Sequence, residues 1–332
     1  MQNLQTTFMG LTIKNPLVVG SSGLSGSIAS IKKLAEAGAG AIILKSVFEE
    51  EILLEAGKIH AAEVSDMKGN AEFFDYFEYE LKQDVLARYA TLIRKAKTEV
   101  TVPIIASINC ISSGEWASYA HKLQQAGADG IELNIMMLGS NPSLTSQQIE
   151  DLHFSIVKNV LKHTSLPVSI KISPYFSAGA SFYQKLSESG INGLVFFNRM
   201  SEFDFDINTR QFSNGSVYSS PQSYSNTLRW ICMLSAGSSC PLIASTGVHD
   251  SQTMIKMLMA GAQAVQVTSA LYTSGVSHIK TLLTELEQWM QTNGYSSLAD
   301  FKGCMARKPN EKPELFERIQ FMKYFTDHDL TT

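Results

Sequence analysis

The sequence predicts an α/β fold, a (β/α)8 TIM barrel in which eight parallel strands alternate with helices. Three observations predict it. Eight short apolar runs, rich in β-branched residues and without polar alternation, occur along the 332-residue chain, as is typical of strands buried on both faces of a parallel sheet. Helical patterns with start and stop signals separate these runs. Each run stops at a small or polar residue, and the carboxyl ends of its strands are where an α/β barrel carries its site.

The predicted elements follow one another in the rhythm of repeated βα units. The eight predicted strands lie at residues 17–19, 41–44, 104–106, 131–133, 168–170, 194–197, 242–244 and 264–267. Amphipathic segments predict helices at residues 27–36, 115–125, 182–188 and 251–259. A glycine follows each of these helices, where a left-handed residue ends the helix and lets the chain enter the next strand: Gly38, Gly127, Gly190 and Gly261.

A single domain accounts for most of the chain. A barrel with loop insertions over its C-terminal face fits residues 1–303. Residues 304–332 are expected to form a C-terminal helical extension, because an apolar stripe runs through residues 314–325, and to pack on the barrel or on a second subunit. Two long gaps between strands, at residues 47–100 and 199–226, are predicted to form lids over the site.

Composition excludes several classes of partner. A net charge of -4 argues against nucleic acid and anionic membranes, because both require a basic surface. No apolar stretch approaches the roughly eighteen residues that span a bilayer, and the first residues lack the pattern of a signal peptide. We therefore expect a cytoplasmic protein that acts on a small molecule. The cysteines occur singly, without the spacing of a metal site, so no metal is expected.

The turns after the seventh and eighth strands predict a phosphate-binding site. Residues 245–248 read Ser-Thr-Gly-Val and residues 268–271 read Thr-Ser-Ala-Leu. Barrels often bind phosphate in these two loops through backbone N–H groups, and Gly247 permits a close approach of the backbone. The alternative is a pair of tight turns without a ligand.

Five longer polar side chains end other predicted strands. Lys45 and Lys171 follow apolar runs, and inward-facing lysines at a barrel mouth call for an anionic ligand. Asn109, Asn134 and Asn198 end three further strands, and an amide offers donors and acceptors to the edge of a flat heterocycle. Together these residues predict a pocket for a phosphorylated, polar aromatic ligand.

Several motifs resemble those of the dihydroorotate dehydrogenase family, which are FMN enzymes built on an α/β barrel. The resemblance extends over nearly the whole chain to Gly303 and is closest to the cytosolic class 1 enzymes. The matching motifs are Asn15-Pro16, Ser22-Gly23 and residues 41–46, 131–134, 168–176, 245–248, 267–271 and 295–303.

This resemblance implies an FMN-dependent oxidoreductase that acts on a CH–CH group and forms a homodimer. Lys45 and Lys171 would lie beside the flavin as catalytic residues, with Lys171 favouring negative charge at the N1–C2=O edge of the reduced ring. The implied cofactor-binding residues are Ser21, Ser22, Lys45, Ser46, Asn109, Asn134, Lys171, Asn198, Ser219, Thr246, Gly247, Val248, Thr268 and Ser269.

The loop after Asn134 departs from the family. Class 1 members read Asn-Leu-Ser-Cys-Pro-Asn here, with the cysteine as base, whereas residues 134–139 read Asn-Ile-Met-Met-Leu-Gly. Met137 occupies the base position, where a thioether cannot take a proton, and the serine of class 2 members is absent as well. A shift of the loop would bring Ser140 inward as a substitute base, together with Asn141, and Cys110 ends a neighbouring strand.

Other substrate positions differ too. The implied substrate residues are Asn134, Asn198, Arg199 and Asn141. Arg199 occupies a family serine position, and residues 65–68 align with the family's Asn-Ser-Met-Gly loop. Three functions stay open at this point: oxidation of dihydroorotate to orotate, a step of pyrimidine biosynthesis, through an unusual base; FMN-dependent chemistry on another ring substrate; and a non-catalytic flavin- or phosphate-binding barrel.

Overall fold

Eight parallel strands form a closed barrel in the computed structural model, which describes residues 2–48, 71–109, 115–200, 202–314 and 316. The barrel strands are β3 (Leu17–Val19), β4 (Ala41–Ile43), β6 (Ile104–Asn109), β7 (Gly130–Asn134), β8 (Val168–Ile172), β9 (Gly193–Phe196), β12 (Leu242–Ala244) and β13 (Ala264–Val267). The strands follow chain order around the barrel, and the parallel pairing of β4 with β6 joins residues such as Ile42 and Ile104. The predicted fold and all eight predicted strands are confirmed.

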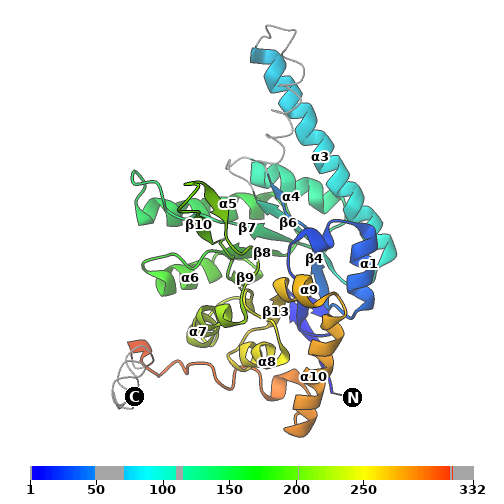
Figure 1. The fold of residues 1–332 in the computed structure, drawn as a ribbon, viewed down its shortest axis with the longest axis vertical. Coiled ribbons are helices and arrows are strands. Elements are labelled where there is room, and N and C mark those ends of the chain that lie inside the picture. Colours follow the sequence, from blue (N-terminus) through cyan, green and yellow to red (C-terminus); the bar gives the residue numbers. More distant parts are fainter. Residues whose placement is uncertain (1, 49–70, 110–114, 201, 315, 317–332) are drawn as a thin grey trace.

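Helices surround the barrel (Figure 1). They are α1 (Ile28–Glu36), α3 (Ala71–Glu99), α4 (Glu115–Gln125), α5 (Ser146–His163), α6 (Gly179–Ser187), α7 (Tyr224–Leu234), α8 (Ser251–Met259), α9 (Ser269–Ser274) and α10 (His278–Thr292), with short 3-10 turns at Gly23–Ser25, Pro221–Ser223 and Leu298–Asp300. The four predicted helices are present as α1, α4, α6 and α8. Helix α5 was not predicted, although Thr145 and Gln148 form the capping box that begins it.

The apolar residues divide into two clusters, one on each side of the strands. The larger cluster lies between the strands and the helices, with residues such as Ile131, Leu133 and Ile170. The smaller cluster fills the lower barrel interior with residues such as Ile43, Ile105 and Ile243. A hairpin of β1 (Thr6–Phe8) and β2 (Leu11–Ile13) supplies Phe8, Met9 and Ile13 to this inner cluster.

Polar residues fill the next level of the barrel interior. Successive residues of a strand point to opposite faces, so Ser107 and Gln266 lie two positions beyond Ile105 and Ala264 of the inner cluster. Glu132 on β7 is the register partner of Ser107 and lies at the same level. All three side chains are buried. The barrel interior therefore changes from apolar to polar toward the carboxyl ends of the strands.

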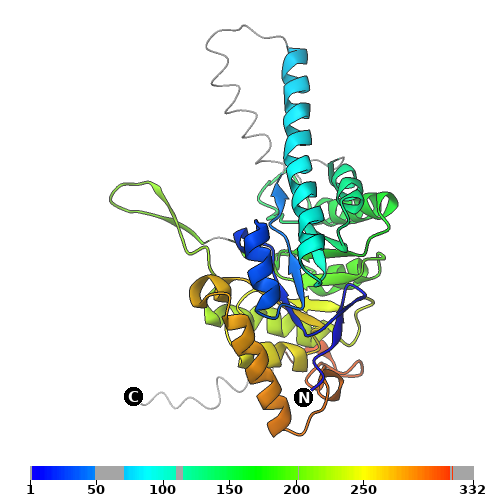
Figure 2. The ribbon, with the colours of Figure 1, turned by 90° about the vertical axis from the view of Figure 1, so that its right-hand side faces the viewer.

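The first long insertion begins with strand β5 (Val47–Phe48), which pairs with β6, and ends in helix α3. Residues 49–70 lie outside the described residues. The amino-terminal part of α3 projects from the barrel in both views (Figures 1 and 2), whereas Leu86, Ile93 and Ala96 in its second half belong to the outer core. The predicted lid role of this segment stays a prediction.

The second insertion contains an antiparallel hairpin of β10 (Phe203–Phe205) and β11 (Phe212–Asn214). The hairpin extends away from the barrel (yellow-green in Figure 2), and Phe203 and Phe212 on it are each about four-fifths exposed. Arg199 at the start of this insertion and residues 217–219 near its end line the central pocket at the barrel rim.

The segment after Gly303 runs past the C-terminal ends of α7 and α8. The backbone N–H of Met305 donates to the carbonyl of Met259 at 2.8 Å, and that of Arg307 to Cys232 at 2.8 Å. Most of the apolar stripe at residues 314–325 lies outside the described residues, so the C-terminal helix stays a prediction. Among the described helices, none is both long and apolar enough to cross a membrane.

His153 on α5 predicts how acid will affect stability. The ring is fully buried between Phe176 and Phe182, and its Nδ1–H donates to the carbonyl of Ile149 at 2.7 Å. Burial lowers the pKa of His153 below its ordinary value. The unfolded chain therefore binds more protons at this residue than the folded chain as the pH falls below about 6.5.

We expect the free energy of unfolding to fall below pH 6.5, with His153 contributing a slope of up to about 1.4 kcal/mol per pH unit. His153→Phe should remove this part of the slope in urea titrations at pH 5 to 7. His163 makes the same contact with the carbonyl four residues earlier but is exposed, so His163→Phe is the matched control for the loss of that contact. An unaltered slope in His153→Phe would contradict the assignment.

Candidate active site

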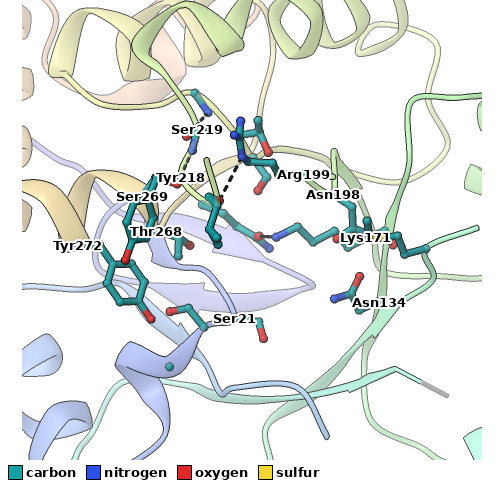
Figure 3. A pocket seen from close by; sticks show the side chains of 18 of the residues that line it. Ser21, Asn134, Lys171, Asn198, Arg199, Tyr218, Ser219, Thr268, Ser269 and Tyr272 are labelled. Carbon is teal, nitrogen blue, oxygen red and sulfur yellow. Dashed lines mark hydrogen bonds between the residues drawn. The ribbon is translucent and has the colours of Figure 1, made fainter. Parts of the chain in front are cut away.

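A pocket of about 500 Å³ opens at the carboxyl ends of the barrel strands (Figure 3). This volume is within the range of small-molecule and cofactor sites. The predicted site residues that line it are Ser21, Ser22, Asn109, Asn134, Lys171, Asn198, Arg199, Ser219, Thr246, Gly247, Val248, Thr268 and Ser269. Residues from distant parts of the chain thus meet at the rim that the sequence predicted.

One end of the pocket is formed by the turns after β12 and β13 and by the loop that carries Ser219. The backbone N–H of Ser219 donates to Ser269 Oγ at 3.0 Å, and that of Gly247 donates to Ser219 Oγ at 3.3 Å. Ser219 Oγ also lies 2.9 Å from His249 Nε2, and burial lowers the pKa of this histidine. Hydroxyl and backbone N–H groups therefore converge at this end.

The turn at Thr246 and Gly247 has an unusual backbone. Both residues lie in the left-handed region, with φ of 78° at Thr246 and 81° at Gly247. This conformation is rare for a β-branched residue, and the Thr246 hydroxyl donates to the carbonyl of Phe197 at 2.9 Å. A Cβ at position 247 would lie 2.2 Å from the backbone nitrogen of Tyr224, so only glycine fits there.

The opposite end is formed by the last residues of β7 and β8 and the segment after β9. Asn134 pairs with Lys171 across the strands, and Asn198 Nδ2 donates to the carbonyl of Lys171 at 3.0 Å. Asn134 Oδ1 is buried without a hydrogen-bond partner among the described residues. A buried acceptor at the wall of a pocket is available to a donor group of a ligand.

Lys171 lies at the floor of the pocket and belongs to a buried polar chain. Its Nζ donates to Gln266 Oε1 at 2.9 Å, and Gln266 Nε2 donates to Glu132 Oε2 at 2.5 Å. Burial lowers the pKa of Lys171, and the charge of Glu132 opposes this shift. Burial raises the pKa of Glu132, against the opposing effects of Lys171 and the Gln266 hydrogen bond. Both charged forms therefore depend on each other.

The structure differs from the sequence prediction at Lys45 and Ser46. Lys45, expected to face inward, is exposed and lines a separate groove that residues of α1 and α3 border. Strand β4 ends at Ile43, and the alternation of side chains is lost before β5 begins at Val47. Ser46 turns inward instead, where its hydroxyl lies 3.0 Å from Ser21 Oγ and 2.7 Å from Ser107 Oγ, behind the pocket lining.

Arg199 lines the pocket, but much of its guanidinium is engaged by the protein. Its Nη2 lies 3.1 Å from the Glu202 carboxylate and donates to the carbonyl of Ser216 at 2.8 Å. Its Nε donates to the carbonyl of Val217 at 3.2 Å. Arg199 therefore fixes the loop that leads to Tyr218 and Ser219.

The loop after β7 presents an apolar side chain to the pocket. Met136 lines the pocket, whereas Met137 is partly buried against the outer core. Ser140 and Asn141 are exposed and absent from the pocket lining, and Asn141 Oδ1 accepts the backbone N–H of Ser143 at 2.9 Å. The inward shift predicted for Ser140 and Asn141 is absent here. Cys110 and residues 65–68 lie outside the described residues.

Several lining and supporting residues were not predicted. Gln266 and Glu132 lie inside predicted apolar strands, where a polar residue at an inward position was the available signal. Tyr218 and Tyr272 flank the pocket with ring centroids 5.1 Å apart, and no strand-end pattern indicates this pair. Three or more metal-ligating side chains do not cluster anywhere in the described part of the chain.

Comparison with known proteins gives this arrangement a family. The family model for dihydroorotate dehydrogenase matches residues 77–290. The chain belongs to the dihydroorotate dehydrogenase family. This membership confirms the predicted resemblance and supports an oxidoreductase that acts on a CH–CH group.

Curated relatives span most of the chain. A protein of Methanocella arvoryzae is 30% identical over 284 residues, which cover 79% of this chain and 85% of the relative. One from Thermoplasma acidophilum is 25% identical over 319 residues, 92% of this chain and 100% of the relative. One from Methanothermobacter thermautotrophicus is 27% identical over 318 residues, 90% and 97% of the two chains. All three are named dihydroorotate dehydrogenase B (NAD(+)), catalytic subunit.

Gly247→Ala should destabilise the protein by about 3 kcal/mol or more, because the new Cβ meets the backbone of Tyr224 and the left-handed φ is strained. Gly294 is a matched control, with φ of +75° and no heavy atom within 4 Å of its ideal Cβ. Gly294→Ala should therefore cost only about 1–2 kcal/mol. Urea unfolding of the two variants measures the difference, and equal losses would contradict the close approach at Gly247.

Proposed function

We propose that this chain is an FMN-dependent oxidoreductase and that the pocket at the barrel rim is its FMN site. The observation that supports the proposal is that one pocket has two chemically different ends. Hydroxyl and N–H groups gather at Ser219, Gly247 and Ser269, and buried Lys171 lies at the other end beside Asn134 and Asn198.

The first end has the chemistry that a phosphate requires. Gly247 lets its turn pack closely on the backbone of Tyr224 while the turn lines the pocket, and the hydroxyls of Ser219, Thr268 and Ser269 border the same part of the pocket. The contacts among Ser219, Gly247 and Ser269 use neutral donors and acceptors, which can be exchanged for stronger hydrogen bonds to a phosphate oxygen. Val248, Ser21 and Ser22 would enclose the phosphate and the ribityl chain.

The second end suits the polar edge of the flavin ring. Asn134 Oδ1 is a buried acceptor without a partner in the described residues, and Asn109 and Asn198 add amide groups around it. When bound, FMN would accept a hydride from a substrate C–H bond or return one to it. The ammonium group of Lys171 would stabilise negative charge that develops at the ring edge.

Dihydroorotate is the first substrate to test, because the curated relatives are named for it. The described residues that line the pocket include no cysteine, histidine, aspartate or glutamate that could serve as the base. The absence of a positioned base typically costs about 10²–10⁴ in rate. Ser140, the proposed substitute, would have to move from an exposed position.

One observation favours a second candidate function, FMN-dependent chemistry on a different ring substrate. Met136 presents a thioether where the family motif presents polar groups, and Arg199 is bound to Glu202 and to two loop carbonyls. The side of the pocket at the β7 loop thus presents an apolar group and an engaged arginine, whereas the side at Ser219, Gly247 and Ser269 presents hydroxyl and N–H groups. A non-catalytic flavin-binding barrel is the third possibility and predicts no reduction by any substrate.

We also propose that the protein is a cytoplasmic homodimer. The exposed hairpin residues Phe203, Ile207 and Phe212 form an apolar surface that a second copy would cover. Sedimentation equilibrium would test this, and a monomer at micromolar concentration would contradict it.

Purified protein should be yellow, its flavin absorbance should survive gel filtration, and the protein should release FMN on denaturation.

Lys171→Ala should still bind flavin but slow its reduction about 10²-fold or more, because the charge beside the ring is lost. Anaerobic mixing with dihydroorotate should bleach the bound flavin if this compound is the substrate. Bleaching by dithionite alone would leave the second and third functions, and a colourless protein that FMN cannot reconstitute would overturn the FMN proposal.

Substitution of the methionines distinguishes a lost base from a repurposed pocket. Met137→Cys restores the family's residue at the predicted base position, and Met136→Cys places a thiol on the side chain that lines the pocket. If the base alone is missing, one variant should gain dihydroorotate-dependent bleaching by about 10²-fold over the parent protein. No gain in either variant would indicate that the whole substrate pocket differs.

A further inference from the structure

Glu132 is a buried acid that the proposed chemistry does not use. Its side chain is 0% exposed and lies in the barrel interior below the pocket, level with Ser107 on β6 and Ser169 on β8. Within the described part of the chain its one hydrogen bond is that to Gln266, and its Oε1 has no partner there. A carboxyl group is rarely buried without a partner of opposite charge.

The direction of each hydrogen bond in this chain is set by chemistry. The Lys171 amine as an ammonium group can only donate, so the oxygen of the Gln266 amide must face it. The amide nitrogen of Gln266 then faces Glu132, whose Oε2 must accept. An ammonium group on Lys171 and an ionised carboxylate on Glu132 therefore match the donor-to-acceptor direction of both hydrogen bonds.

The charges of Lys171 and Glu132 act on each other in the barrel interior. The charge that affects the pKa of Lys171 is that of Glu132, and the charge that affects the pKa of Glu132 is that of Lys171. Tyr89 on α3 also interacts with Glu132, and burial raises the pKa of Tyr89, so its phenol stays neutral. Asn134 on the same strand, and Ser107 and Ser169 on the neighbouring strands, carry no charge.

We propose that Glu132 is a positioning residue that acts through Gln266 to hold Lys171 as an ammonium ion at the floor of the pocket. Without the carboxylate, a buried amine would lose its proton more readily and present a neutral group to the ligand. This inference rests on the proposed function only where it concerns the flavin, because the charge of Lys171 can be measured in the protein without a cofactor.

The first test is the pH dependence of urea unfolding of the apoprotein between pH 7 and 10. A buried lysine with a lowered pKa binds fewer protons in the folded chain than in the unfolded chain, so stability rises with pH between its folded pKa and about 10.5. The contribution of Lys171 is the difference between the parent protein and Lys171→Met. Glu132→Gln keeps the size of the side chain and should move the onset of this rise about one pH unit lower.

A double variant tests whether the effect of Glu132→Gln comes from the lost charge or from altered packing. In the double variant Glu132→Gln/Gln266→Glu, the carboxylate moves one position along the chain and accepts directly from Lys171 Nζ. This exchange should return the onset to the parent value or above it. Ser169→Ala is the matched control, because it removes a buried polar atom at the same level of the barrel without changing charge, and should leave the onset unchanged.

The flavin-loaded protein supplies an independent readout. The midpoint potential of the bound flavin should become more negative in Glu132→Gln above the new pKa of Lys171, and the double variant should restore it. An unchanged onset in Glu132→Gln apoprotein, or no recovery in the double variant, would overturn the role of Glu132. A shifted onset with a flavin potential insensitive to Lys171→Met would instead contradict the proposed location of the flavin ring.

Discussion

Closure of the parallel barrel is the constraint on which the rest of the molecule depends. Because β4 pairs with β6 and every barrel strand runs in the same direction, all eight carboxyl ends lie at one rim. Residues far apart in the chain therefore meet there: Lys171 and Gln266 are 95 positions apart and hydrogen-bonded at 2.9 Å. The loops at this rim can vary widely while the strands hold their ends in place.

The side chains inside the barrel support the floor of the pocket. The inner apolar cluster, closed by Phe8 and Met9, excludes water from the lower barrel and supports the polar level above it. Burial of Lys171 and Glu132 in that polar level carries a desolvation cost that stability alone does not call for. Buried charges of this kind mark functional sites in proteins, and here they lie directly beneath the pocket.

The two sides of the pocket are held by the protein to different degrees. The Thr246–Gly247 turn, Ser219 and Ser269 form a tightly connected unit, in which a side chain at position 247 would collide with backbone. The loop after β7 is bound less tightly, with Met136, Leu138 and Leu144 exposed. A scaffold with one constrained side and one variable side can keep a cofactor while its substrate changes.

Sequence alone determined the barrel, its eight strands and most of the pocket. Strand periodicity depends on local burial, and strand ends of a parallel barrel must converge, so Asn134, Lys171 and Gly247 could be assigned to one rim without coordinates. Helix α5 could also have been predicted from the capping box at Thr145 and Gln148.

Only the tertiary structure decided which side chains of the rim face inward. Lys45 and Ser46 were both predicted to bind the cofactor, but Lys45 is exposed and Ser46 lies behind the pocket lining, because β4 ends at Ile43 before β5 begins at Val47. Met136 rather than Met137 reaches the pocket because the loop after β7 has no periodicity to fix its direction. The hydrogen-bonded chain from Lys171 through Gln266 to Glu132 likewise depends on how β8, β13 and β7 are placed around the barrel. Strand order follows from a local pattern, whereas side-chain direction outside regular strands and contacts across a barrel follow from packing.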